Sequence, residues 1–284
     1  MRNVRHVLLT LILLVAPGFT STAFGDSATQ FTRVDEDKDG LPRALQLGVV
    51  TYVGRGITVD LVSAIHIGDQ SYYAELNDRF RNYDALLYEL VAPAGIDISE
   101  QVARRKGLLS KTQVSLTKLL DLSFQLDEID YSRPNFVHAD LSPSEFRQSM
   151  EDRDESLYVY FWRIFFASVN EYAKDPLGLR DIQMLSSMIT SGQDDSLKTM
   201  MAYEMTNLDA VQDILGEDSD SAIVGARNER AIEVLRRQLD AGARRVGIFY
   251  GVAHMPDLEE RLLDDVGLSY AETAWVDAWK LGGE

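Results

Sequence analysis

The chain has 284 residues, of which 45% are hydrophobic, and a formal net charge of −17 at pH 7. This apolar content is enough for one sizeable core, and the length fits one α/β domain or one domain with a helical insertion. The strong negative charge repels phosphate backbones, which argues against nucleic acid as a partner. Because the sequence contains no Cys, disulfides, thiol catalysis and thiolate metal sites are excluded.

The first 25 residues have the pattern of a secretory signal peptide. Two Arg precede an apolar run from Val7 to Ala16, and Ala23-Phe24-Gly25 resembles a cleavage site. The run is much shorter than the roughly 20 residues that a membrane-spanning helix needs. We therefore expect export to the periplasm or the cell exterior, a mature chain that begins near Asp26, and no membrane span after cleavage.

A polar leader is expected over residues 26–45, ahead of one domain over residues 46–284. Within the leader, Asp35 to Gly40 match the first half of a calcium-binding loop. The match fails further on, because Pro42 occupies the eighth position and Gln46 the twelfth. The pattern therefore indicates a loosely held leader with a solvated acidic turn instead of a calcium site.

A β-hairpin is expected next. Residues Gln46 to Arg55 are rich in β-branched side chains, and the turn Gly54-Arg55-Gly56 leads into a second apolar run from Val59 to Ile67. This pattern predicts two strands that pair at one edge of the sheet.

The second of these strands starts a strand, helix, strand unit. Gly68 and Asp69 are turn formers, and apolar residues then recur at spacings of three and four from Tyr72 to Tyr83. That spacing predicts an amphipathic helix. A further strand is expected from Ala85 to Val91. We expect the two strands to be parallel neighbours, because a short right-handed crossover favours that arrangement.

Glu89 is the most informative residue of this unit because it lies in an apolar strand. A buried carboxylate is unfavourable unless it is paired, protonated or bound to a metal. The sequence leaves two interpretations open, an ion pair with an Arg or a functional carboxylate. Both Glu89 and His66 fall towards the carboxyl ends of their strands, where open α/β sheets form ligand crevices.

Strand patterns then disappear, so residues 99–205 are expected to form a helical insertion or cap. Leu116 to Ile129 has helical spacing, and a helix that starts after an N-cap at Ser142 could extend to Val169. The segment from Phe161 to Phe166 is apolar nearly all round, so we expect it to be buried or to line a groove.

The α/β pattern returns at the end of the chain. We expect a helix from Asn228 to Leu239, a buried strand from Val246 to Ala253, a helix from Pro256 to Val266 and a last strand from Tyr270 to Leu281. The elements together predict an α/β (α+β) fold. Its central sheet is mixed and mainly parallel, with helices on its faces and a large helical insertion.

Two His and one Glu are expected to meet at the carboxyl edge of this sheet. His66 and His254 each follow an apolar strand, and Glu89 lies between or beside them. Two imidazoles and one carboxylate suit a divalent transition metal and leave positions open for water and substrate. The alternative is that both His are structural, with ring nitrogens bonded to the backbone.

Further polar residues could complete the site. His138 or Asp140 could reach a metal shell or act as general base, and a helix-capping or loop role fits the sequence equally well. Arg227, with Asn228 and Arg230 beside it, could hold the buried carboxylate or an anionic group of a substrate. Ordinary hydrogen bonding at a helix start is the alternative for these three residues.

Four short motifs carry a family resemblance: Ala64-Ile65-His66-Ile67-Gly68, Tyr88-Glu89-Leu90, Ala226-Arg227-Asn228-Glu229-Arg230 and Tyr250-Gly251-Val252-Ala253-His254-Met255-Pro256. From about Gln46 to its end, the chain resembles the TraB/GumN family. This family includes the pheromone-shutdown protein TraB and the Tiki proteins, and is related more distantly to the ChaN haem-binding and erythromycin-esterase folds. The resemblance implies that His66, Glu89 and His254 bind a divalent metal that supports peptide-bond hydrolysis. It favours manganese or cobalt over zinc as that metal.

Two functions follow as hypotheses. The first is an exported, metal-dependent hydrolase of the peptidase type that acts on a peptide or another small substrate. In it Glu89 is ligand or base, His138 a further candidate base, and Arg227 stabilises the developing oxyanion. The second is a non-catalytic protein that sequesters a peptide or haem under the aromatic helical cap.

Overall fold

The computed structural model describes residues 29–92, 122–153, 195–206 and 221–281. The expected signal peptide and much of the expected insertion, including Phe161 to Phe166, lie outside these residues. Among the helices that the structure describes, none is both long enough and apolar enough to cross a membrane.

A seven-stranded mixed sheet forms the centre of the fold. Its strands are β1 (Thr32–Glu36), β2 (Pro42–Gly54), β3 (Ile57–Ala64), β5 (Ala85–Tyr88), β7 (Phe136–His138), β8 (Arg245–Gly251) and β9 (Ser269–Lys280). β3, β8, β5 and β7 are parallel, whereas β2 is antiparallel to β1, β3 and β9. Two short strands, β4 (Ile67–Gly68) and β6 (Ser123–Phe124), pair separately. The predicted α/β class with a mixed central sheet is confirmed.

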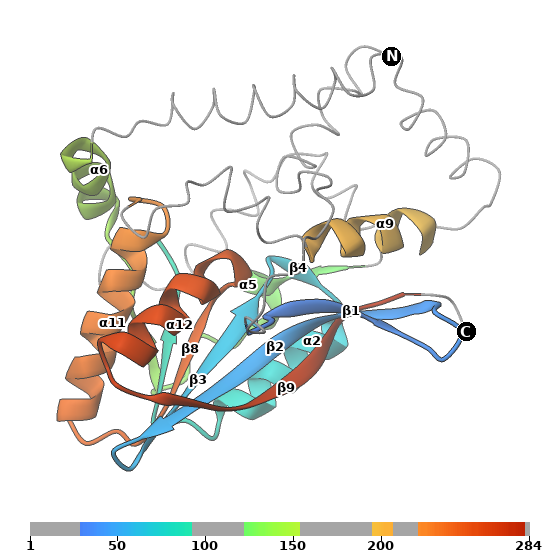
Figure 1. The fold of residues 1–284 in the computed structure, drawn as a ribbon. Coiled ribbons are helices and arrows are strands. Elements are labelled where there is room, and N and C mark those ends of the chain that lie inside the picture. The colour runs from blue at the N-terminus through green and yellow to red at the C-terminus, as the bar shows by residue number, and fades with distance from the viewer. Residues whose placement is uncertain (1–28, 93–121, 154–194, 207–220, 282–284) are drawn as a thin grey trace.

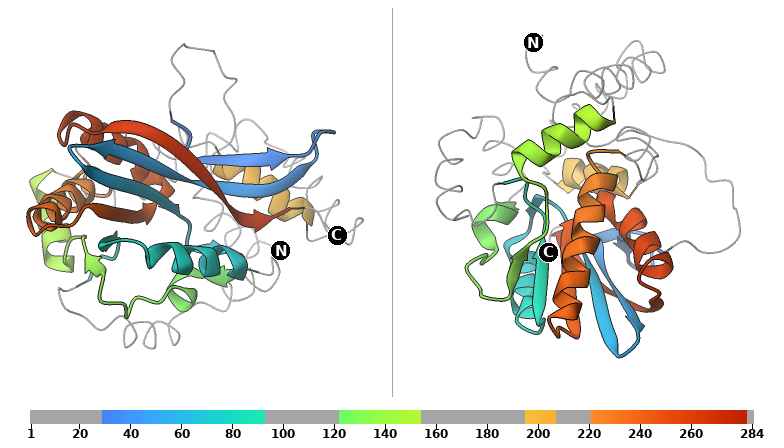
Figure 2. Two further views of the ribbon diagram at one scale, coloured as in Figure 1. Left: turned by 90° about the horizontal axis from the view of Figure 1, so that it is seen from below. Right: turned by 90° about the vertical axis from the view of Figure 1, so that its left-hand side faces the viewer.

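Helices cover both faces of this sheet, as Figures 1 and 2 show. The expected amphipathic helix is α2, which buries its apolar side against one face, and α11 and α12 pack on the other. The helices are α2 (Gln70–Phe80), α5 (Gln125–Glu128), α6 (Pro143–Asp152), α9 (Asp195–Met205), α11 (Gly225–Asp240) and α12 (Met255–Asp264), with a 3-10 turn, η1 (Val252–His254), ahead of α12.

The strand order explains why the helices lie on opposite faces. The chain passes from β3 through α2 to β5, and it later returns through α11 to β8, which lies between β3 and β5. Right-handed crossovers that run in opposite directions place their helices on opposite faces. β3 and β5 are parallel, as expected. They are not neighbours, which corrects the second part of that expectation, because β8 lies between them. The carboxyl ends of all four parallel strands meet at one edge of the sheet.

β2 and β3 form the expected hairpin. Its two turn residues, Arg55 and Gly56, have φ values of 51° and 74°, and two positive φ values are typical of a type I′ turn. The hairpin does not lie at the edge of the sheet, as its sequence suggested, because β9 pairs with β2 along the side opposite β3.

The expected loosely held leader is wrong from Thr32 onward. β1 pairs with β2 in antiparallel register, so the sheet begins well before Gln46. The acidic turn between these strands is present as expected. The Asp37 carboxylate accepts the backbone N–H of Asp39 at 2.8 Å and that of Leu41 at 2.9 Å. The hydrogen bonds from Leu41 and Asp39 lower the pKa of Asp37, so the turn stabilises itself through local backbone contacts.

The expected insertion contains strands as well as helices. β7 joins the central sheet and β6 pairs with β4, so the expected helix over residues 116–129 is wrong at residues 123–124. Of the expected helix over residues 116–129, the structure describes only the short α5 as helical. Strands of two and three residues are too short to produce an alternating pattern.

Ser142 caps α6 as the sequence indicates. The Glu145 N–H donates to Ser142 Oγ at 3.2 Å, and the Ser142 N–H donates to the Glu145 carboxylate at 2.8 Å. These two reciprocal bonds form a capping box. α6 ends at Asp152, and most of the expected extension to Val169 lies outside the described residues.

Gly247 allows β8 to pack closely against its neighbours. A Cβ at this position would lie 2.7 Å from Leu86 Cδ1 and 2.8 Å from Tyr83 Cε2. We expect Gly247→Ala to lower the free energy of unfolding by about 1–3 kcal/mol through overpacking, as measured by urea unfolding. Gly48→Ala in β2 is the control, since its nearest contact would be 3.3 Å, and it should destabilise less. The opposite ranking of the two variants would contradict this account.

Candidate functional site

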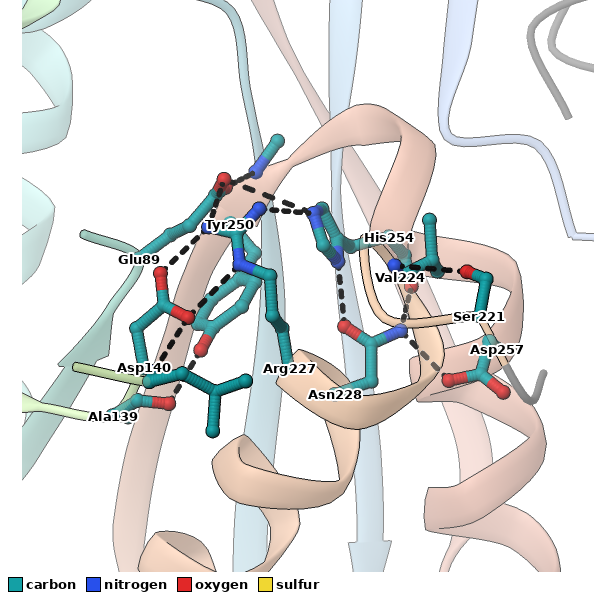
Figure 3. Close-up of polar contacts among 12 residues, drawn as sticks. Glu89, Ala139, Asp140, Ser221, Val224, Arg227, Asn228, Tyr250, His254 and Asp257 are labelled. Carbon is teal, nitrogen blue, oxygen red and sulfur yellow. Dashed lines mark hydrogen bonds and ion pairs between the residues drawn. The ribbon is translucent and has the colours of Figure 1, made fainter. Parts of the chain in front are cut away.

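Polar side chains from four elements meet at the carboxyl edge of the parallel strands (Figure 3). Glu89 follows β5 directly, Asp140 lies two residues after β7, and His254 ends the 3-10 turn after β8. Arg227 and Asn228 belong to the first turn of α11. The topology therefore brings together residues that are up to about 165 positions apart in the sequence.

Arg227 bridges two carboxylates. Its Nη2 donates to Glu89 Oε1 at 2.7 Å and to Asp140 Oδ2 at 2.6 Å, and its Nε donates to Asp140 Oδ1 at 2.9 Å. The Asp140 side chain is fully buried, and those of Arg227 and Glu89 are 11% and 16% exposed. The bidentate pairing with Asp140 fixes the guanidinium plane. The ion pair of Glu89 with an Arg is thus present, and a functional role for this carboxylate stays a prediction.

The second oxygen of Glu89 is held by the backbone. The Gly251 N–H donates to Glu89 Oε2 at 2.7 Å, and a Cβ at Gly251 would approach that oxygen to 3.2 Å. Burial alone would raise the pKa of Glu89, but the charges of His254 and Arg227 and the Gly251 N–H outweigh it and lower the pKa. Because Arg227 is always charged, Glu89 is ionised at neutral pH.

Asn228 fixes the orientation and tautomer of His254. Its Nδ2 donates to the His254 backbone oxygen at 3.1 Å and to Asp257 Oδ2 at 2.7 Å. Because Nδ2 faces two acceptors, the orientation of the Asn228 amide is assigned. Asn228 Oδ1 must then accept a hydrogen bond from His254 Nδ1–H, at 2.7 Å. Neutral His254 therefore carries its proton on Nδ1, and the lone pair of its Nε2 can accept the hydrogen bond from Arg227 Nη1 at 3.5 Å.

The lone pair of His254 faces the two charged groups. His254 Nε2 lies 3.7 Å from Glu89 Oε1 and 3.5 Å from Arg227 Nη1. Burial lowers the pKa of His254, and Arg227 lowers it further against the opposing effect of Glu89. The Tyr250 ring packs edge-on against the imidazole at 5.3 Å, and its hydroxyl donates to the Ala139 carbonyl at 2.5 Å. The site thus holds a neutral imidazole beside an ionised carboxylate.

Three candidate residues lie apart from this arrangement. His66 is exposed, and its ring makes no hydrogen bond or ion pair with another described residue, although its charge contributes to the lowered pKa of Glu89. His138 Nε2 lies 2.6 Å from the Leu90 carbonyl oxygen, so this side chain forms a hydrogen bond with the backbone. Arg230 pairs with Glu145 at 2.9 Å and with Glu233 in the next turn of α11.

The side chains as placed do not fit the expected three-ligand metal site. Glu89 Oε1 and His254 Nε2 converge, but Arg227 already donates to the first and lies 3.5 Å from the second. His66 does not join them. In the described parts of the chain, no three His, Asp or Glu side chains are grouped closely enough to hold an ion. The metal centre and the haem alternative therefore stay predictions.

Comparison with family models, with curated proteins and with solved structures finds no match for this chain. The resemblance to the TraB/GumN family therefore stays a prediction.

Sequence reasoning placed Glu89, His254 and Arg227 together but missed how they are held. Asp140 was considered as a base or metal ligand, whereas it pairs with Arg227. For Asn228 the sequence leaves open the binding of an anionic group or ordinary hydrogen bonding at a helix start, and the structure shows that it orients His254. The available signal was position, since Asn228 lies beside Arg227 in one of the motifs and Asp140 lies two residues after His138.

Removing Arg227 should leave two buried carboxylates without their cation. We expect Arg227→Met to lower the free energy of unfolding at pH 7 by about 3–5 kcal/mol, as measured by urea unfolding. Arg230→Met, one turn along the same helix, removes only half-exposed ion pairs and should cost about 1 kcal/mol or less. Similar losses in the two variants would contradict the assigned role of Arg227.

The tautomer of His254 can be observed directly by NMR of ¹⁵N-labelled protein over a pH series. We expect a pKa below the ordinary value of 6.5 and, above that pKa, a proton on Nδ1. Asn228→Asp should raise the pKa, because a carboxylate beside Nδ1 stabilises the imidazolium. A neutral ring protonated on Nε2, or an unchanged pKa in Asn228→Asp, would show that the hydrogen-bond assignment is wrong.

Proposed function

We propose that the chain is a hydrolase whose reaction centre is formed by Glu89, His254 and Arg227. The observation that supports it is the placement of the His254 imidazole, which Asn228 orients through Nδ1 and whose Nε2 lies 3.7 Å from Glu89 Oε1. A buried base with a lowered pKa next to an ionised carboxylate in a ligand-binding position of the sheet is characteristic of acid–base chemistry.

In the proposed reaction, His254 Nε2 accepts a proton from a water molecule while the water oxygen attacks the carbonyl carbon of the substrate. Glu89 stabilises the imidazolium that forms, since their charges are opposite and the two groups are close. His254 then gives the proton to the leaving group as the bond to the carbonyl carbon breaks. The water supplies the hydroxyl of the acid product, so atoms and protons balance.

Arg227 is suited to stabilise the oxyanion. Its Nε and Nη2 are used by Asp140 and Glu89, whereas Nη1 makes only the long contact of 3.5 Å to His254. An N–H of Nη1 is therefore left for the carbonyl oxygen of a substrate. A fixed cation at the point where negative charge develops lowers the barrier without reorganisation. In this scheme Asp140 is a positioning residue that holds the guanidinium plane.

The substrate class and location follow from the sequence. We propose a peptide or another small carbonyl compound as substrate and an exported mature protein that begins near Asp26, because the signal-peptide pattern and the family resemblance both point that way. The strongly acidic composition accords with substrates other than nucleic acid.

Hydrolysis by the mature chain can be tested with blocked peptides and p-nitrophenyl esters. We expect His254→Ala to lower kcat/KM by a factor of about 10² to 10⁴, which is the usual contribution of a general base. In the wild type kcat/KM should rise with pH through the His254 pKa, below 6.5, because only the neutral ring accepts a proton. His138→Gln, which can still donate to the Leu90 carbonyl, should keep kcat/KM within about threefold.

A chelation arm separates this mechanism from metal-dependent hydrolysis. Dialysis against EDTA should leave the activity unchanged if His254 is the base. Loss of activity that Mn²⁺ or Co²⁺ restores would contradict the general-base mechanism and support the metal centre that the sequence predicts. Absence of hydrolysis in the whole panel would contradict the proposed function itself.

A further inference from the structure

Two polar side chains, Gln125 and Tyr131, bond to each other beside Tyr88, the residue that precedes Glu89 in the chain. Gln125 begins α5, and its backbone N–H donates to the His66 carbonyl oxygen at 2.9 Å. Its side-chain Nε2 donates to the Tyr131 hydroxyl oxygen, also at 2.9 Å. Gln125 is 7% exposed, so its amide is held inside the protein.

This pair leaves one acceptor and one donor unused. Gln125 Oε1 is buried and has no hydrogen-bond partner among the residues that the structure describes. The Tyr131 oxygen already accepts from Gln125, so its own hydrogen is left to donate, and no residue in the described parts of the chain accepts it. A buried acceptor without a partner is unfavourable, and native proteins rarely keep one without a reason.

Aromatic packing connects the pair to Glu89. The Tyr131 ring packs edge-on against Tyr88, with ring centres 5.3 Å apart, and Tyr88 immediately precedes Glu89 in the chain. Burial raises the pKa of Tyr131, and the charge of Glu89 raises it further, against a hydrogen bond from Gln125. The Tyr131 hydroxyl is therefore close enough to Glu89 to sense its charge.

We propose that Gln125 and Tyr131 are specificity-determining residues that bind one amino-acid residue of an extended substrate through its main-chain amides. Gln125 Oε1 accepts the N–H of that residue, and the Tyr131 hydroxyl donates to its C=O. One residue of an extended chain presents both groups on the same side, as in a hydrogen-bonded pair of antiparallel strands. The proposal rests on the proposed hydrolase function and adds to it a preference for amides over esters.

The preference follows from the unused acceptor. An ester lacks the N–H, so it would leave Gln125 Oε1 unpaired and bring a second oxygen against it. A carboxylate is disfavoured for the same reason, and also because Glu89 is nearby and ionised. A main-chain amide satisfies both members of the pair.

The test uses the mature full chain and a library of N-acetylated hexapeptide amides, selected for binding at equilibrium and identified by mass spectrometry. The peptide that binds best is then remade with single N-methyl groups, each of which removes one N–H. One N-methylation should weaken binding to the wild type at least tenfold. The same change should weaken binding to Gln125→Leu by less than twofold, because the acceptor is absent there.

Two further variants keep the test decisive. Tyr131→Phe retains the ring packing and should weaken binding of the unmodified peptide about tenfold. Gln70→Leu removes an exposed amide that also contacts α5, through Glu128 at 3.4 Å, and should keep the full sensitivity to N-methylation. Thermal unfolding of each variant checks that it is folded.

The proposal is overturned if Gln125→Leu keeps the N-methyl sensitivity of the wild type, or if no library peptide prefers the wild type over Gln125→Leu. Cleavage of the same peptides is followed separately. Binding that depends on Gln125 without any cleavage would support the peptide-binding role of the pair and contradict the hydrolase. Cleavage that is indifferent to Gln125 and to N-methylation would support the hydrolase and contradict the proposed role of the pair.

Discussion

The fold depends at its functional edge on one interaction, the bridge from the Arg227 guanidinium to the carboxylates of Glu89 and Asp140. Without the guanidinium, both carboxylates would lose their ion-pair partner inside the protein, and moving an unpaired charge out of water is strongly unfavourable. A buried ion pair contributes little net stability compared with an apolar replacement, yet losing one partner is destabilising. The bridge therefore acts mainly as a constraint that fixes α11 against the ends of β5 and β7.

The same helix turn also positions His254, the proposed base. Arg227 and Asn228 are consecutive, so they point in different directions from the first turn of α11, one towards the carboxylates and the other towards His254. Asn228 is in turn held by Asp257 at the start of α12. One turn of one helix thus sets the ionisation of Glu89 and the tautomer of His254 together. Such preorganisation is what an acid–base centre requires, since its groups must be oriented before substrate arrives.

Local sequence patterns predicted the elements with strong periodicity or distinct turn chemistry. The α2 spacing, the Arg55-Gly56 turn and the Ser142 cap each depend on neighbouring residues, so the sequence contains their signal. The place of β8 between β3 and β5 depends on long-range pairing, so local patterns did not predict it. The strands β1 and β7 were not predicted either, because both are short. The meeting of Glu89, His254 and Arg227 was predictable because the carboxyl ends of parallel strands converge. The roles of Asp140 and Asn228 could not be predicted, because they depend on where the side chains lie to within tenths of an ångström.

The most direct measurement of the central interaction is a double-mutant cycle between Glu89→Gln and Arg227→Met, with unfolding free energies determined in urea at pH 7. If the guanidinium holds an ionised Glu89, the two losses should be non-additive, with a coupling energy of about 2 kcal/mol or more. Additive losses, with a coupling energy of about 0.5 kcal/mol or less, would contradict the account. They would mean that the two side chains are neighbours without a mutual dependence.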